Sequence, residues 1–103
     1  MTTQELDRQF IAPTYGRFPV TLVKGQGALF TDENGKQYID MGSGIAVSTC
    51  GACDPIWVEA VTRQANTLGH TSNLYYTQPQ TRLAEMLCQR TGMQKVFLSL
   101  IHI

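Results

Sequence analysis

Hydrophobic residues between positions 20 and 41 come in short runs separated by glycine and polar turn residues. The runs are 20–23, 28–31 and 37–41. Runs of this length, bounded by turn residues, are typical of strands. The polar segment Asp32–Lys36 separates the second run from the third, and its Asn34-Gly35 pair is a strong hairpin signal. The pattern predicts a small antiparallel sheet over residues 20–41.

A short helix is predicted before this sheet. Thr2 or Thr3 is a suitable N-cap, and Glu5 lies early in the helix, where the helix dipole favours an acid. Pro13 ends the helix, which we expect to extend through Phe10. Residues 13–19 are expected to be extended.

Two longer helices are predicted after a loop at 42–44 and a short apolar run at 45–47. The first begins at the N-cap residue Asp54 and ends before Gly69. Its apolar residues have helical spacing: Ile56, Ala60, Val61, Ala65 and Leu68. The second begins at Thr77, whose spacing to Gln80 is that of a capping box, and ends at Gly92. Its apolar residues are Leu83, Ala84, Leu87 and Cys88.

The last predicted element is a buried strand over Val96–Ile103, because nearly all of these residues are apolar. A buried strand normally continues into a turn or a helix, whereas this chain stops inside the apolar run. We therefore expect the chain to be a fragment of a larger fold. It contains no internal repeat and no linker.

Composition narrows the classes of protein that fit. The chain has 103 residues, 43% hydrophobic and 16% charged, which suits one small domain and argues against disorder. The net charge is +0, so no electrostatic footprint for nucleic acid or an anionic membrane is present. The polar N-terminus excludes a secretory signal. Three cysteines are too few for a disulfide scaffold, so a reducing, cytoplasmic location is predicted.

The motif Cys50-Gly51-Ala52-Cys53 is the sharpest local signal for chemistry. It lies at a predicted helix start, where the helix dipole favours a thiolate, as in a dithiol redox site of a thioredoxin-like oxidoreductase. However, the adjacent Asp54 opposes thiolate formation, and no tryptophan precedes Cys50. Two small, partly buried thiols are the alternative interpretation. His70, Cys88 and His102 do not complete a paired ligand spacing, so no metal site is predicted.

The predicted loop 70–76 is polar and aromatic, and its segment Ser72–Tyr76 suits a pocket for a planar, polar ligand. The alternative is that Tyr75 and Tyr76 pack across the loop and bind its backbone. Tyr15, between two prolines, leaves the same two interpretations open.

Three stretches, in their order and spacing, resemble the start of a class III aminotransferase. They are 15–20 (YGRFPV), 25–28 (GQGA) and 32–40 (DENGKQYID). Two more, 44–47 (GIAV) and 72–80 (SNLYYTQPQ), resemble the acetylornithine aminotransferase branch of that family. The resemblance runs from about residue 15 to residue 97, which is most of the chain.

This resemblance implies an α/β fold, namely the N-terminal segment of a fold-type I transferase that depends on pyridoxal phosphate. Such a segment has an N-terminal helix, a small antiparallel meander and two helices that lead into a truncated large domain. Residues 1–53 would form the N-terminal arm and small sheet. Residues 54–97 would begin the large domain, and residues 98–103 are an atypical tail.

The resemblance also implies a reaction, in which N-acetylornithine gives its amino group to 2-oxoglutarate in arginine biosynthesis. The family consists of homodimers with pyridoxal phosphate as cofactor, and its partners are amino-acid and 2-oxo-acid substrates. Tyr15 would approach the distal end of the substrate, and Ile45 would border the substrate pocket. Asn73 and Tyr75 would approach the active site of the partner subunit. Ornithine, succinylornithine and 4-aminobutyrate remain alternative amino donors, although Ile45 offers a free amine no polar partner.

Two departures from the family pattern bear on activity. Where the family has a Gly-His-x-His-Pro turn, this chain has 51–55 (GACDP), so both histidines are replaced. Where the family has the glycine-containing cradle of the cofactor phosphate, this chain has 98–103 (LSLIHI). None of its lysines, Lys24, Lys36 and Lys95, has the context of a Schiff-base lysine. We therefore expect no catalytic residue and no activity in the isolated chain, and the cofactor-binding residues stay unidentified. A thioredoxin-like oxidoreductase using Cys50 and Cys53 is the alternative function, and a non-catalytic interaction fragment comes third.

Overall fold

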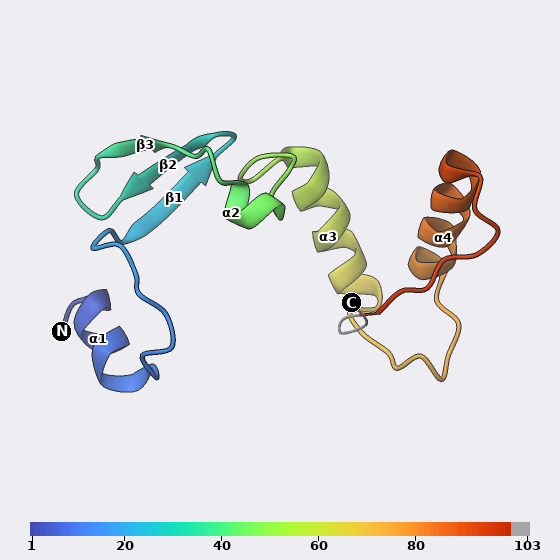
Figure 1. The fold of residues 1–103 in the computed structure, drawn as a ribbon, viewed down its shortest axis with the longest axis horizontal. Coiled ribbons are helices and arrows are strands. Elements are labelled where there is room, and N and C mark those ends of the chain that lie inside the picture. The colour runs from blue at the N-terminus through green and yellow to red at the C-terminus, as the bar shows by residue number, and fades with distance from the viewer. Residues whose placement is uncertain (100–103) are drawn as a thin grey trace. The chain divides into compact units, whose positions relative to one another are not determined.

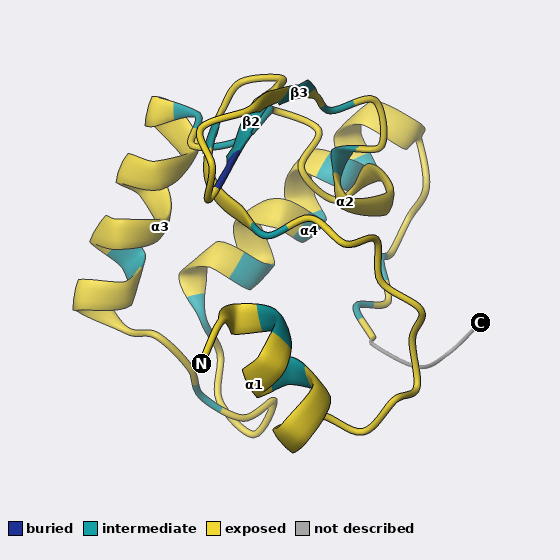
Figure 2. Cartoon of the chain, turned by 90° about the vertical axis from the view of Figure 1, so that its left-hand side faces the viewer, coloured by how far each residue is buried: buried dark blue, intermediate teal, exposed yellow. Residues whose placement is uncertain are grey.

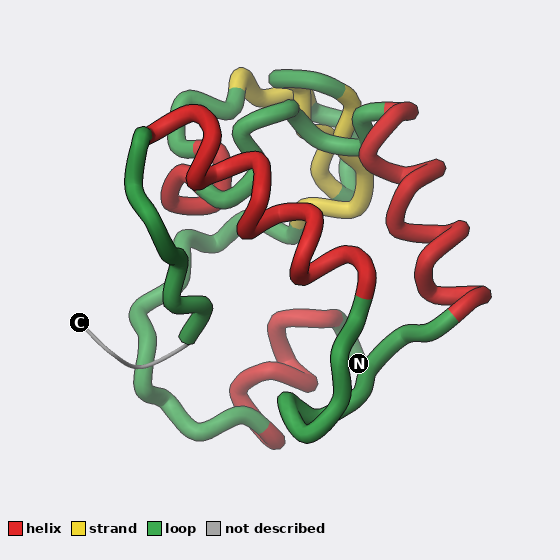
Figure 3. The backbone as a smooth tube through the Cα atoms, turned by 90° about the vertical axis from the view of Figure 1, so that its right-hand side faces the viewer, coloured by secondary structure: helices red, strands yellow, loops and turns green. Residues whose placement is uncertain are grey.

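The computed structural model describes residues 1–99, which fold into helices and one small sheet (Figure 1). The elements are α1 (Thr3–Phe10), β1 (Leu22–Gln26), β2 (Leu29–Asp32), β3 (Gln37–Ile39), α2 (Ser43–Ala46), α3 (Pro55–Thr67) and α4 (Gln78–Thr91). The strands follow one another between residues 22 and 39, and helices and loops make up the rest of the described chain (Figure 3). The chain divides into two compact units, Met1–Thr67 and Leu68–Ile103.

Helix α1 begins with the predicted cap. The Oγ1 atom of Thr2 accepts a hydrogen bond from the backbone N–H of Glu5 at 3.3 Å. The Glu5 side chain accepts in turn from the N–H of Thr2 at 2.7 Å, which completes a capping box. The helix ends at Phe10, so the predicted N-terminal helix is confirmed.

The predicted antiparallel sheet is confirmed, in the order β1-β2-β3. Phe30 in β2 pairs with Gly25 on one side and with Tyr38 on the other. Strand β1 extends beyond the first hydrophobic run to Gln26 and so includes Gly25. A Cβ atom at Gly25 would lie 2.6 Å from the Phe30 ring, so the ring occupies the space where a side chain would stand.

Asp32 organises the turn between β2 and β3 and is the one buried residue of the described chain, 7% exposed (Figure 2). Its Oδ1 atom accepts from the backbone N–H groups of Asn34 and Lys36, each at 2.9 Å. Its Oδ2 atom accepts from the Tyr38 hydroxyl at 3.0 Å. Burial raises the pKa of Asp32, but these hydrogen bonds and the Lys36 charge outweigh burial, so its pKa lies below the ordinary value.

The expected loop at 42–44 and apolar run at 45–47 are instead a single helical turn, α2, of the opposite hand. Residues 43–46 all have positive φ, between 48° at Ser43 and 61° at Gly44 and Ile45. Non-glycine residues in this conformation cost roughly 1–2 kcal/mol each. The turn is held by Asp40, whose Oδ1 atom accepts from the N–H groups of Gly42 and Ser43, both at 2.9 Å.

Helix α3 begins as predicted. The Oδ1 atom of Asp54 accepts from the backbone N–H of Trp57 at 3.0 Å, and Pro55 occupies the first helical position. Its apolar side chains stay exposed, 78% for Ile56 and 58% for Trp57. Helix α3 thus forms from local signals, while its apolar face has no core to pack into within its own unit.

The second unit contains α4, which ends at Gly92 with a φ of 74°, as predicted. The predicted capping box is wrong, because the Thr77 side chain makes no capping bond and Gln80 donates to the Asn73 Oδ1 atom at 3.1 Å. The predicted strand is also wrong for residues 96–99, which have no strand neighbour among the described residues of this unit. The rest of that predicted strand, 100–103, lies outside the described residues.

None of the helices in residues 1–99 is long and apolar enough to cross a membrane.

Candidate functional site

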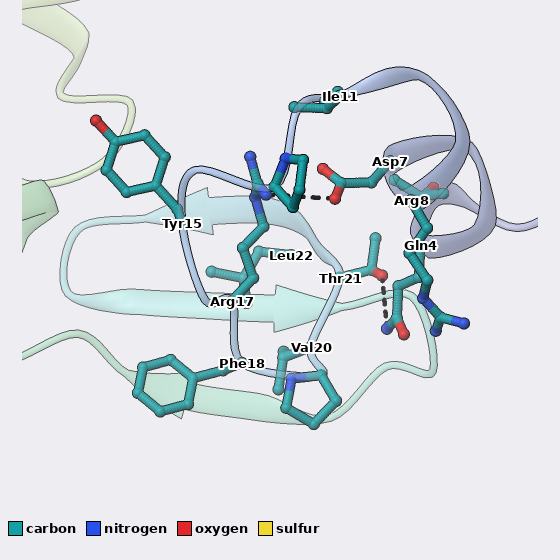
Figure 4. Close-up of a pocket in the computed structure, with 13 residues that line it drawn as sticks. Gln4, Asp7, Arg8, Ile11, Tyr15, Arg17, Phe18, Val20, Thr21 and Leu22 are labelled. Atoms are coloured by element: carbon teal, nitrogen blue, oxygen red, sulfur yellow. Dashed lines mark hydrogen bonds and ion pairs between the residues drawn. The ribbon is translucent and has the colours of Figure 1, made fainter.

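A pocket of about 590 Å³ lies between α1, the segment that follows it and the start of β1 (Figure 4). Its wall from α1 includes Gln4 and Asp7, and its wall from the following segment includes Tyr15, Arg17 and Thr21. One of the predicted site residues, Tyr15, is therefore among the residues that line this pocket.

The charged centre of the pocket is an ion pair. A guanidinium nitrogen of Arg17 lies 3.3 Å from the Asp7 Oδ2 atom, and the two side chains are 49% and 29% exposed. The Gln4 amide donates to the Thr21 hydroxyl at 3.4 Å and joins α1 to the segment before β1. Because a guanidinium has five N–H donors, Arg17 keeps donors for a carboxylate while it is bound to Asp7.

Tyr15 lies at the rim of this pocket. Its side chain is 77% exposed, and Figure 4 shows its ring directed away from the Arg17–Asp7 pair. A phenol at the mouth of an open pocket suits the recognition of the end of a bound molecule. Tyr15 was predicted as a site residue from the sequence, whereas Arg17, in the same YGRFPV stretch, was not.

Ile45 does not line this pocket. It lies in the left-handed turn α2 with a φ of 61°, and its side chain is 95% exposed. The turn is attached to the sheet, because the N–H of Asp40 donates to the Ala28 carbonyl at 2.8 Å. Backbone strain of this kind persists only where the surrounding structure over-determines the conformation, and such positions gather at functional sites.

The CGAC turn is joined to the sheet by its backbone. Gly27 and Ala52 exchange two hydrogen bonds, both 2.8 Å long, in an isolated antiparallel bridge. Gly51, with a φ of 86°, lies so close to Gly27 that a Cβ atom there would be 3.0 Å from the Gly27 Cα atom. Cys50 and Cys53 are free and exposed. The expectation of partly buried thiols is therefore wrong.

The remaining predicted site residues, Asn73 and Tyr75, lie in the loop that precedes α4 in the second unit. Asn73 is held by Gln80, and the N–H of Tyr75 donates to the Ser72 carbonyl at 3.2 Å. The Tyr75 side chain is 68% exposed and that of Tyr76 fully exposed, so the expected packing of the tyrosines across the loop is not observed. Each unit therefore holds two of the four predicted residues.

The residues present do not fit covalent capture of an aldehyde cofactor. All three lysines are exposed, and none lines the pocket. Schiff-base formation needs a lysine that is desolvated or otherwise activated in a prepared pocket. Among residues 1–99, no group of three or more His, Cys, Asp or Glu side chains could hold a metal ion.

Comparison with known proteins gives one consistent family. The family model described as aminotransferase class-III matches residues 10–100. An acetylornithine aminotransferase of Haemophilus ducreyi is 46% identical over 93% of this chain and 24% of its own length. That of Methanosarcina acetivorans is 50% identical over 90% of this chain and 24% of its own length. The chain thus spans about a quarter of the length of these curated relatives.

Solved structures agree. The acetylornithine aminotransferase of Elizabethkingia anophelis is similar to 89% of this chain with a TM-score of 0.83 at 30% identity, over 24% of that enzyme. The N-acetylornithine aminotransferase of Stenotrophomonas maltophilia is similar to 82% of this chain with a TM-score of 0.71 at 39% identity, over 22% of that enzyme.

Proposed function

The chain belongs to the class III aminotransferase family, and from this premise we propose that it is the N-terminal part of an enzyme that transfers the amino group of N-acetylornithine to 2-oxoglutarate. The observation that carries the proposal is the agreement with acetylornithine aminotransferases along nearly the whole chain, at 46% and 50% identity for the two relatives above.

Within that enzyme, we assign substrate contacts to Tyr15, Ile45, Asn73 and Tyr75. The exposure of these groups in the isolated chain suits residues that face a ligand or the rest of a larger protein. Ile45 favours an acylated donor, because an alkyl side chain offers no hydrogen bond to a free distal amine. Arg17 is the polar group of the first unit that best suits a substrate carboxylate.

The family uses pyridoxal phosphate, which supplies an electron sink for amino-group transfer when it is bound. A structure of taurine:2-oxoglutarate aminotransferase from Bifidobacterium kashiwanohense, to which this chain is also similar, is described in complex with PLP and glutamate. Since the lysines of this chain do not fit the cofactor, we place cofactor capture elsewhere in the complete enzyme. That enzyme would be a cytoplasmic homodimer, with residues 1–53 as arm and small sheet, 54–97 as the start of the large domain and 98–103 as an atypical tail.

The thioredoxin-like alternative is contradicted. It requires Cys50 and Cys53 at the edge of the central sheet of a thioredoxin-like domain, whereas the aminotransferase class-III model matches residues 10–100 and so includes the whole motif.

A chimaera tests the proposal. Residues 1–97 of this chain replace the corresponding segment of the Haemophilus ducreyi enzyme, and glutamate formation from 2-oxoglutarate is measured with N-acetylornithine, ornithine and 4-aminobutyrate in turn. We expect N-acetylornithine to be the preferred donor, and the unmodified enzyme is the control. A chimaera that binds the cofactor, as its absorbance shows, but prefers ornithine or 4-aminobutyrate contradicts the donor. A chimaera that does not bind it contradicts the assignment of this segment to such an enzyme.

A further inference from the structure

We propose that Cys50 and Cys53 form a reversible disulfide within the CGAC turn, which makes this turn a site of oxidative modification. The proposal is independent of the proposed function, because it concerns only the chemistry of residues 50–53. It also differs from a thioredoxin-like activity, since the disulfide is a state of this chain and serves no catalytic cycle.

The Ala52 side chain shows which side of the CGAC turn faces the sheet. Ala52, between the two cysteines, points onto the sheet, because its Cβ atom would lie 2.8 Å from a Cβ atom placed at Gly25. Ala52 therefore occupies the side of the turn that faces β1. Cys50 and Cys53 are both exposed and free, so reagents in solution reach both sulfur atoms.

Hydrogen bonds fix the backbone of the CGAC turn. The N–H of Gly51 donates to the Ser48 carbonyl at 2.9 Å, and both Gly51 and Cys53 have positive φ, 86° and 54°. The turn closed by this hydrogen bond includes Cys50, and Cys53 follows three positions later with a left-handed backbone. The double hydrogen bond between Gly27 and Ala52 holds this conformation against the sheet. A held turn raises the effective concentration of one thiol at the other.

Cys88, the remaining cysteine, is a less favourable disulfide partner for Cys50 or Cys53. It is half-buried in α4, in the second unit, whereas Cys50 and Cys53 are three positions apart in one turn. Closing so short a loop costs less conformational entropy than closing a long one.

The reaction needs a disulfide oxidant, and oxidised glutathione is sufficient. The thiolate of one cysteine attacks a glutathione sulfur atom, forms a mixed disulfide and releases one glutathione thiolate. The second cysteine, as thiolate, then attacks the mixed disulfide and releases the second glutathione. The protein loses two protons and two electrons, and oxidised glutathione takes them up to become two reduced glutathione molecules.

The test uses the full 103-residue chain in graded mixtures of oxidised and reduced glutathione. The products are alkylated and weighed by mass spectrometry. We expect a monomeric product that carries one alkyl group, on Cys88, and that lacks the hydrogen atoms of the two thiols at Cys50 and Cys53. The variant C88S should lose both of its thiols in the same way. The matched variant C53S should instead accumulate a glutathione mixed disulfide at Cys50. Mixed disulfides at both positions of the unsubstituted chain, or a disulfide to Cys88, overturn the proposal.

A second measurement asks whether the disulfide forms in the folded turn. Amide hydrogen exchange of Gly27 and Ala52 is compared between the reduced and the oxidised chain. We expect protection of both amides to persist after oxidation, because their bridge is made by backbone atoms of Gly27 and Ala52 and by no atom of either cysteine. Loss of this protection on oxidation would show that the disulfide requires the turn to open, and would overturn the proposal as stated.

Discussion

Asp32 shows how one buried carboxylate can organise a hairpin. Two backbone N–H groups and the Tyr38 hydroxyl donate to it, and their combined effect lowers its pKa. A carboxylate with a lowered pKa stabilises the fold above the pKa of the unfolded chain, about 3.9, and this stabilisation is lost as the pH falls through the folded pKa. The hairpin should therefore loosen below about pH 4.

The variant D32N tests this dependence. Its amide oxygen can still accept the backbone bonds, but it does not titrate. We expect the amide signals of Asn34 and Lys36 to change with pH below 4 in the original chain and much less in D32N, as measured by NMR. An identical acid transition in both chains would show that other carboxylates control the hairpin.

Asp40 has the same role for the strained turn α2. Its Oδ1 atom accepts from two backbone N–H groups, and nothing in an alanine could replace that acceptor. We expect D40A to release residues 43–46 from the left-handed conformation, which appears in NMR as changed N–H to Hα couplings, and D40N to preserve it. Retention of the couplings in D40A would mean that the hydrogen bonds from Ala46, Val47 and Ser48 hold the turn without Asp40.

At the level of elements, the two longer helices begin in different ways. Asp54 caps α3 through its side chain, whereas Thr77 makes no such bond at the start of α4. Loss of a functional N-cap costs about 1 kcal/mol of helix stability. We expect D54A to lower the helical content seen by circular dichroism and T77A to leave it nearly unchanged. Equal losses in the two variants would contradict the difference between the two caps.

At the level of the whole molecule, the described residues include no buried hydrophobic side chain. The apolar faces of the helices are left in water, for example Val61 of α3 at 45% and Leu83 of α4 at 48% exposed. Exposed apolar faces are association hazards. We expect the isolated chain to self-associate as its concentration rises, which light scattering coupled to size-exclusion chromatography would detect. A monodisperse monomer over a hundredfold range of concentration would contradict this.

The isolated chain should also be inactive in transamination. Its three lysines are exposed and lie outside the pocket. A mixture of the chain, pyridoxal phosphate, N-acetylornithine and 2-oxoglutarate should form no glutamate beyond a boiled control. Because surface lysines form unspecific imines, a yellow colour is not a positive result. Glutamate formation that one lysine-to-alanine substitution abolishes would refute the prediction.

Sequence alone was sufficient for the elements whose signals are local. The Thr2 cap of α1, the Asn34-Gly35 turn, the start of α3 and the end of α4 all depend on residues within a few positions of each other, and all were predicted. The family was also identified from the order of short stretches, and the comparison confirms it. Tyr15 was selected from one such stretch, but its ion-paired neighbours Asp7 and Arg17 were not.

Only the tertiary structure decided the features that depend on distant contacts. Gly25 belongs to β1 because it pairs with Phe30 of β2, and Ala52 joins the sheet because it exchanges hydrogen bonds with Gly27. The left-handed turn at 43–46 is bound by the Asp40 side chain, and the Asp40 N–H in turn donates to the Ala28 carbonyl of the sheet. Residues 96–99, although largely apolar, form no strand, because a strand exists only where a neighbour pairs with it. Short-range preferences are written in adjacent residues, whereas these outcomes depend on which distant groups the fold brings together.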